Sequence, residues 1–199
     1  MTDKNLILYL PMDDPDNSTV AYDYSKSRAD AQLSGGAHFS REAKIGKSLA
    51  LGNGEAQTPL AINFDGDFTL SLYIKTTSDK IGWLVNLPGV DHYIEQWIDV
   101  VPNTWVFLAF IKEGSSFSVY KHLTRMGMYE LSATPLGFSI NDPNLDVSDG
   151  VLIDEVMLFD TAKPVTEILQ AVEEKTDVEY YVNGMNFKDF GVHVSKSNG

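Results

Sequence analysis

The sequence predicts an all-β protein in which two antiparallel sheets pack as a sandwich, with one short helix near the C-terminal end. Short apolar runs are separated by clusters of Gly, Asn, Asp and Pro along residues 1–160, which is the pattern of sandwiches and barrels. Several of these runs alternate apolar and polar side chains with the period of two that half-buried strands show. One segment, which follows Pro164, changes to the helical period.

Four runs carry the strand predictions. "QLSGGAHF" predicts a tight hairpin, because Gly35 and Gly36 can adopt the positive φ of its turn. The run from Phe68, "FTLSLYIK", alternates throughout and predicts a strand with one buried face. "WVFLAFI" is apolar at both parities, which is typical of a central strand covered on both faces. "FIKEGSSFSVY" predicts a second hairpin with a longer loop through Gly114.

The C-terminal part contains the predicted helix and a separate tail. Pro164 suits the first turn of a helix, and the apolar residues after it recur on one helical face, which predicts a helix over about residues 164–174. These apolar residues are Val165, Ile168, Leu169 and Val172. Asn183-Gly184 then lies between apolar runs and predicts a hairpin. We therefore expect a sandwich domain over residues 1–175, and a β-hairpin-like extension or the start of a further domain over residues 176–199.

Composition narrows the classes of partner. A chain of 199 residues is long enough for one substantial core. Its 28 acidic and 15 basic side chains give a net charge of -13, which repels phosphate backbones and anionic lipid surfaces. Nucleic acid is therefore not an expected partner. The absence of cysteine excludes disulfides and thiolate metal sites.

Neither a leader nor a membrane span is expected. "LILYLPM" is apolar, but no basic segment precedes it and no small-residue cleavage site follows. The longest strongly apolar run, "WVFLAFI", is far shorter than the roughly 20 residues that a spanning helix needs. We therefore expect no membrane insertion; the location is unknown, and a virion-associated or a cell-surface setting is compatible with the sequence.

Six motifs follow one another between about residues 5 and 170. They are "LILYLPMDD", "AYDYSKSRADAQLSGG", "GKSLALGNGEAQT", "GDFTLSLYIKTTS", "NTWVFLAFIKEGSSFSVY" and "VLIDEVMLFDTAKPVTEI". In this order they resemble laminin-G-like and concanavalin-A-like lectin domains, which implies a two-sheet antiparallel jelly roll. The chain departs from that family at Tyr73, where tryptophan is usual, and in lacking Asp-Gly after Tyr120. These departures leave the sandwich intact but put any family-typical loop site there in doubt.

The run "VLIDEVMLF" places two carboxylates, Asp154 and Glu155, side by side in an apolar strand. On a regular strand they point to opposite faces, and a carboxylate beside a packed core is costly unless it is paired, hydrogen-bonded or bound to a metal. The family resemblance implies a structural calcium ion beside the closing strand. Asp154 is then the first candidate ligand, with Asp13 or Asp14 of the opening turn. The alternative is that Asp154 accepts backbone N–H bonds at the strand entrance while Glu155 faces water.

No arrangement of side chains predicts catalysis. Glycosidases on related jelly rolls need two carboxylates about 5 to 9.5 Å apart on one face. Asp154 and Glu155 are adjacent, and Glu95 and Asp99 would lie about 13 Å apart at strand rise. We therefore expect a non-catalytic protein, with a glycoside hydrolase as a minor alternative.

The segment "HYIEQWID" is the candidate ligand-binding strand. One face of this strand carries Tyr93, Glu95, Trp97 and Asp99. An aromatic ring flanked by polar groups suits a sugar, because the CH face of the sugar packs on the ring while its hydroxyls find directional partners. The alternative is that Tyr93 and Trp97 pack between the sheets. Trp83 and Trp105 lie in strongly apolar runs, and we assign both to the core.

The tail "YYVNGMNFKDFGVHVSKS" resembles the opening strands of bacteriophage tail-component domains. With the lectin-like resemblance, this implies a recognition module that binds a glycan or a protein surface, displayed on a phage tail or a similar surface assembly. The alternative is a purely structural domain that contacts sister subunits and has no ligand of its own.

Overall fold

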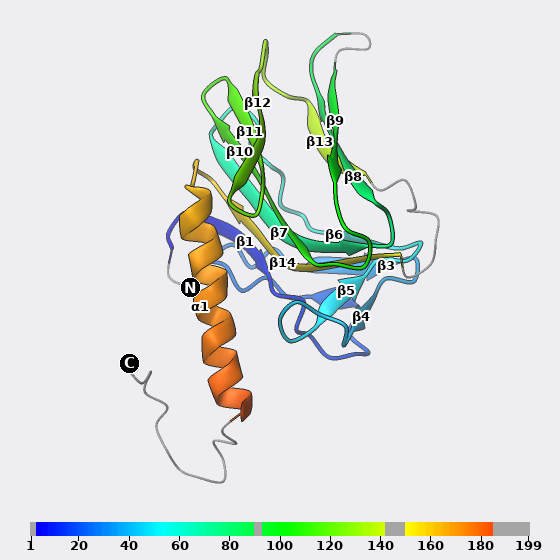
Figure 1. Ribbon diagram of the computed structural model, residues 1–199. Coiled ribbons are helices and arrows are strands. Elements are labelled where there is room, and N and C mark those ends of the chain that lie inside the picture. Colours follow the sequence, from blue (N-terminus) through cyan, green and yellow to red (C-terminus); the bar gives the residue numbers. More distant parts are fainter. Residues whose placement is uncertain (1–2, 90–92, 142–149, 185–199) are drawn as a thin grey trace.

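The computed structural model describes residues 3–89, 93–141 and 150–184, and confirms an all-β antiparallel sandwich with a single helix among them (Figure 1). In chain order the elements are β1 Leu6–Leu10, β2 Val20–Ala21, β3 Ala31–Ser34, β4 His38–Ser40, β5 Ser48–Ala50, β6 Glu55–Gln57, β7 Phe68–Thr76, β8 Lys80–Asn86, β9 Tyr93–Asp99, β10 Val106–Glu113, β11 Ser116–Lys121, β12 Thr124–Glu130, β13 Gly137–Asn141, β14 Val151–Phe159 and α1 Val165–Gly184.

One large sheet and two small sheets make up the sandwich. The large sheet has the strand order β12-β11-β10-β7-β14-β5-β4. Along one edge β14 pairs with β7, and along the other it pairs first with β5 and then with β1. The small sheets have the orders β13-β8-β9 and β2-β3-β6. All of these strand pairs are antiparallel.

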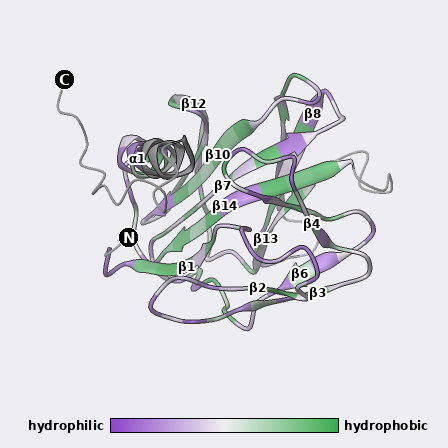
Figure 2. Ribbon diagram, turned by 90° about the horizontal axis from the view of Figure 1, so that it is seen from below, coloured by the Kyte–Doolittle hydropathy of each residue, from purple (hydrophilic) through white to green (hydrophobic). Residues whose placement is uncertain are grey.

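The core lies between the large sheet and the two small sheets. Trp83 of β8 is 1% exposed and contacts Phe117 and Tyr129, with ring centroids 5.5 and 5.1 Å apart. Ala21 and Ala31 of the other small sheet belong to the same cluster. The assignment of Trp83 to the core is therefore confirmed. Figure 2 shows the hydrophobic strand segments, in green, gathered in the middle of the molecule.

The helix α1 adds a third layer on the outer face of the large sheet. Its predicted apolar face is confirmed, because Val165, Ile168, Leu169 and Val172 are each at most 9% exposed. They pack with Tyr73 of β7 and Phe107 of β10 in a second apolar cluster. Trp105 is partly buried against this cluster rather than in the main core. No helix in residues 3–89, 93–141 or 150–184 is long and apolar enough to cross a membrane.

This third layer explains one error of the strand predictions. The run from Phe68 was expected to bury one face only, but Thr69, Ser71 and Tyr73 on its other face are buried as well. A helix lying over a strand removes the polar face from water without altering the strand's alternation. The central strand in "WVFLAFI" is confirmed as β10, which lies between β7 and β11.

Two of the predicted hairpins, those at Gly35-Gly36 and at Gly114, have different outcomes. β10 and β11 form the expected hairpin, with Gly114 at a φ of 57° in its turn. Gly35 and Gly36 also have positive φ, of 64° and 105°, but they do not join a hairpin. They connect β3, which pairs with β2 and β6, to β4, which pairs with β5 in the large sheet. The predicted turn is present, but the strands on either side of it do not pair with each other, because the chain crosses from one sheet to another there.

The helix is longer than predicted and changes the reading of the tail. It begins at Val165 as expected but continues to Gly184, so residues 176–182 are helical rather than the first strand of a hairpin. Asn183 and Gly184, the predicted hairpin turn, are instead the last two residues of this helix. Residues 185–199, the remainder of the expected extension or further domain, lie outside the described residues.

The expectation that Asp154 and Glu155 point to opposite faces is wrong, because β14 contains a bulge. The pairing with β7 passes from Asp154↔Tyr73 to Met157↔Ser71, so Glu155 and Val156 together face one residue. Glu155 has a φ of 51°. The extra residue shifts the alternation by one, and both carboxylates lie on the side of the large sheet that α1 covers.

Candidate functional site

The edge strand β9 presents the predicted binding residues to solvent. Ile98 is 2% exposed and faces the core, as does the partly buried Ile94, while Glu95 and Asp99 are exposed on the other face. Tyr93 is 51% exposed and Trp97 is 46% exposed. The alternative in which the two aromatic rings pack between the sheets is therefore wrong, and all four candidates share one open face, called the β9 face below.

Trp97 is held against the neighbouring strand by a glycine. Gly82 on β8 is its cross-strand partner, and a Cβ built on Gly82 would lie 2.8 Å from Cζ3 of the Trp97 ring. The indole thus rests where a side chain would otherwise stand. Lys80 Nζ lies 5.5 Å from the ring centroid, within the range of a cation–π contact. These two neighbours fix the position of an aromatic ring that remains half exposed.

Polar groups flank the ring along the same face. Glu95 and Asp99 lie two residues before and two residues after Trp97, and Asp99 is the cross-strand partner of Lys80. A carboxylate on each side of an exposed indole can accept hydrogen bonds from hydroxyls of a ring stacked on that indole. Tyr93 lies about 13 Å from Trp97 at strand rise, far enough to contact a different unit of an extended ligand.

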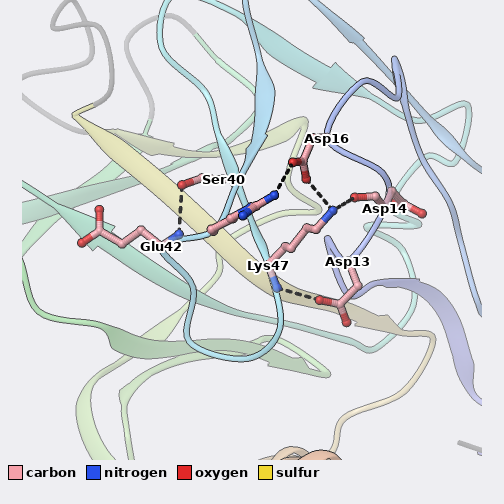
Figure 3. A network of polar contacts seen from close by, with 7 residues as sticks. Asp13, Asp14, Asp16, Ser40, Glu42 and Lys47 are labelled. Atoms are coloured by element: carbon pink, nitrogen blue, oxygen red, sulfur yellow. Dashed lines mark hydrogen bonds and ion pairs between the residues drawn. The ribbon is translucent and has the colours of Figure 1, made fainter. Parts of the chain in front are cut away.

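The predicted calcium ligands in the opening turn already have protein partners (Figure 3). Asp13 Oδ1 accepts the backbone N–H of Lys47 at 2.7 Å. Asp14 Oδ2 accepts the backbone N–H of Tyr22 at 3.1 Å. The ammonium group of Lys47 binds the carbonyl oxygen of Asp14 at 2.8 Å and Asp16 Oδ1 at 2.6 Å. A lysine cation therefore occupies this acidic turn.

Asp154 caps the same loop from the other side. Its Oδ2 accepts the backbone N–H groups of Lys44 and Ile45, both at 2.9 Å. Its Oδ1 has no hydrogen-bond partner within the part of the chain that the structure describes. Burial of this carboxyl, together with the nearby charge of Glu155, raises the pKa of Asp154 to about 8 although the two N–H bonds act to lower it. Asp154 is thus largely protonated at neutral pH.

The alternative to the calcium site is half correct. Asp154 does accept backbone N–H bonds, but Glu155 is fully buried rather than facing water. Calcium takes six to eight oxygen ligands. Among the described residues, no three His, Asp or Glu side chains lie close enough together to hold a metal ion. The calcium site stays an untested prediction.

The sequence reasoning did not identify Asp23, a fully engaged buried carboxylate. Its Oδ1 accepts the backbone N–H groups of Tyr9 and Ser25, at 2.9 and 2.8 Å. Its Oδ2 accepts the Ser25 hydroxyl and the Ala29 N–H, both at 2.8 Å. Four donors around one carboxylate fix the loop before β3 against β1. The signal was present in the Asp-x-Ser spacing of "YDYSKS", which is typical of an Asx turn.

No protein-family model matches the sequence, and a search of curated proteins finds no match. Several solved structures are similar. The binding domain of Paraclostridial Mosquitocidal Protein 1 is 14% identical with a TM-score of 0.59, over 82% of this chain and 51% of that chain. The binding domain of botulinum neurotoxin serotype D is 12% identical with a TM-score of 0.60, over 85% of this chain and 52% of that chain.

A third similar structure is domain 4 of AbnA, a GH43 extracellular arabinanase from Geobacillus stearothermophilus, in complex with arabinotriose. It is 17% identical with a TM-score of 0.55, over 82% of this chain and 96% of that chain. At these identities the likeness shows the β-sandwich fold alone, which is consistent with the lectin-like jelly roll that the motif order predicted. The chain spans about half the length of the two toxin binding domains.

Proposed function

We propose that this sandwich is a non-catalytic recognition module that binds a carbohydrate through the β9 face. The observation that carries the proposal is the pair of exposed aromatic rings, Trp97 and Tyr93, on one face of an edge strand with carboxylates between and beside them. Two half-exposed aromatic side chains on one face of an edge strand provide apolar surface that a ligand can cover. Stacking of a sugar ring on Trp97 would cover that apolar surface.

The charges of the β9 face define the class of glycan. Glu95 and Asp99 accept hydrogen bonds and repel anions, and the net charge of -13 has the same effect at longer range. A neutral glycan, whose hydroxyls donate to these carboxylates, fits this face better than an acidic one. The separation of about 13 Å between Tyr93 and Trp97 favours an oligosaccharide over a single sugar unit.

Two further observations support a binding role. Domain 4 of the arabinanase, which this chain matches over nearly its whole length, was solved in complex with an oligosaccharide. The two carboxylates on the β9 face lie about 13 Å apart, beyond the roughly 5 to 9.5 Å that glycosidases need, so the minor alternative of a glycoside hydrolase has no support from this face.

The setting that we propose is a phage tail or a similar surface assembly, and it rests on the sequence of the tail. The resemblance of "YYVNGMNFKDFGVHVSKS" to tail-component domains falls mainly on residues 185–199, outside the described residues. A protein surface remains the second class of partner for the β9 face.

One observation favours the structural alternative, in which the domain contacts sister subunits. β12 is the other edge of the large sheet and exposes Met126 at 43% and Met128 at 56%, with Leu123 just before it at 56%. Three exposed apolar side chains at an unpaired strand edge suit a subunit contact. Such a contact would coexist with glycan binding or replace it.

A glycan-array screen of the wild type, Trp97→Ala and Tyr24→Ala tests the proposal. Tyr24 is a matched control, because it is 55% exposed and lies in the loop after β2. We expect binding of neutral oligosaccharides that Trp97→Ala abolishes and Tyr24→Ala retains. Absence of any binding, together with a concentration-dependent oligomer in light scattering that Met128→Ser dissociates, would instead establish the structural role.

A further inference from the structure

A separate cleft lies on the outer face of the large sheet, beside the start of α1. It has a volume of about 300 Å³, and its floor is formed by outward side chains of β10, β11 and β12. Residues 162–165, which lead into α1, form its wall. The large sheet and the main core separate this cleft, called the α1 cleft below, from the β9 face.

The floor of the α1 cleft carries a row of hydroxyl groups without protein partners. On β11, Phe117 and Val119 are each 1% exposed and face the core, so Ser116, Ser118 and Tyr120 must face outward. The hydroxyls of these three residues make no hydrogen bond with any residue that the structure describes, although all three line the cleft. Such a row can bind the hydroxyl or carboxylate oxygens of a ligand.

A guanidinium group lies at one end of this row. Arg125 on β12 is the cross-strand partner of Tyr120, and its one described side-chain contact is with Met128 Sδ at 3.8 Å. No carboxylate pairs with it within residues 3–89, 93–141 and 150–184. The other cation of the cleft, Lys163, is already paired with Asp3 at 2.6 Å. Arg125 is therefore the cation available to a ligand.

The opposite end of the cleft has the opposite charge. Glu113 on β10 is the partner of Ser116, which lies about 13 Å along β11 from Tyr120 at strand rise. The apolar side chains of Ile111, Met128 and Val165 line the cleft between the two ends. The cleft thus has a cationic end at Arg125, a hydroxyl-lined floor with apolar walls, and an anionic end at Glu113.

We propose that the α1 cleft binds an acidic sugar unit, with its carboxylate on Arg125 and its hydroxyls on the adjacent hydroxyls of Tyr120 and Ser118. A planar guanidinium beside hydroxyl donors is the arrangement that recognises a carboxylate by paired, charge-assisted hydrogen bonds. The volume of about 300 Å³ is at the small end of the range for ligand sites, which limits the ligand to a unit of this size. This site differs from the β9 face in both position and ligand charge.

The test uses two sugars that differ only at C6, D-galacturonic acid with a carboxylate and D-galactose with a hydroxymethyl group. Each is titrated into the full chain and followed by protein NMR shifts and calorimetry. We expect saturable binding of galacturonic acid, and binding of galactose that is at least about tenfold weaker. Arg125→Met should weaken galacturonic acid binding by about tenfold or more, and Ser118→Ala by a smaller factor.

Arg41→Met is the matched control, since Arg41 is exposed, pairs with Asp16 and directly follows β4, at the opposite edge of the large sheet from β12. It should leave galacturonic acid binding unchanged, and a melting curve for each variant checks that the fold is retained. Equal affinity for the two sugars, no saturable binding of galacturonic acid, or unchanged binding by Arg125→Met would overturn the proposal. Any sugar signal lost in Trp97→Ala instead belongs to the β9 face.

Discussion

The Tyr9 hydroxyl of β1 donates a hydrogen bond of 2.8 Å to Glu155 Oε2 of β14, beneath α1 and out of contact with water. Tyr9 is 8% exposed and Glu155 is fully buried. The bond exists because the bulge in β14 turns Glu155 toward the side of the large sheet on which Tyr9 lies. A carboxylate in this position depends on its donors, because no water replaces them.

We expect Tyr9→Phe to lower the free energy of unfolding by about 1–3 kcal/mol, the cost of removing one donor from a buried acceptor. Urea unfolding followed by circular dichroism measures this change. Tyr24→Phe, which alters an exposed tyrosine, should shift the midpoint little. Equal midpoints for Tyr9→Phe and the wild type would show that the hydrogen bond contributes nothing to stability.

The bulge also marks the limit of what the sequence predicted. The alternation of β9, the core position of Trp83 and the apolar face of α1 followed from spacing, because each depends only on neighbours along the chain. The bulge did not, since its positive φ falls on Glu155 rather than on a glycine, and a glutamate gives no local signal for that conformation.

Contacts between distant segments account for the other differences. The burial of Tyr73 depends on α1, which lies far along the chain, and the partner of β4 depends on the sheet to which the chain crosses after Gly36. Local periodicity defines which side chains share a face but not what covers that face. For β9 the same periodicity grouped Tyr93 and Trp97 correctly and left their exposure open until the layers were known.

Asp154 should make the protein less stable as pH rises. Its pKa is raised to about 8 in the folded state, from 3.8, so the folded protein holds a proton that the unfolded chain has released. The stabilising effect of this proton is complete below about pH 4 and is lost as pH rises toward about 8. Within that window the free energy of unfolding should fall by up to about 1.4 kcal/mol per pH unit.

Urea unfolding of the wild type and Asp154→Asn at about pH 5 and about pH 8 measures this effect. Two other groups also contribute to the pH dependence of the free energy of unfolding. Burial raises the pKa of Asp14, so its contribution also falls as pH rises. Burial lowers the pKa of His122, so its contribution increases as pH rises. Both groups are present in wild type and variant, so the difference between the two reports Asp154 together with its coupling to the neighbouring Glu155. A wild type and variant with parallel pH dependence would contradict the prediction.

Calcium should leave the melting temperature unchanged. A ligand that binds only the folded state raises stability, so a calcium site would appear as a higher melting temperature in calcium than in chelator. We expect no such rise, because the Lys47 ammonium group already lies in the acidic turn and Asp154 accepts the backbone N–H of Lys44 in the loop before Lys47. Lys47→Met removes the ammonium group and shows whether it excludes the ion. A rise in the wild type that Asp154→Asn abolishes would establish the site that the family resemblance implied.

Gly82→Ala should displace the ring of Trp97 without unfolding the protein. The added Cβ would lie 2.8 Å from the ring, closer than such contacts occur, whereas Gly137→Ala in the same sheet places its Cβ 3.5 Å from the nearest atom and serves as the control. Trp83 is buried and Trp105 is partly buried, so quenching of tryptophan emission by acrylamide reports mainly on Trp97.

We expect stronger quenching and a red shift in Gly82→Ala and neither change in Gly137→Ala, with loss of glycan binding in the first variant alone. Identical quenching in the two variants would mean that Gly82 does not position the ring, and the β9 face would then lose the feature that holds its aromatic platform in place.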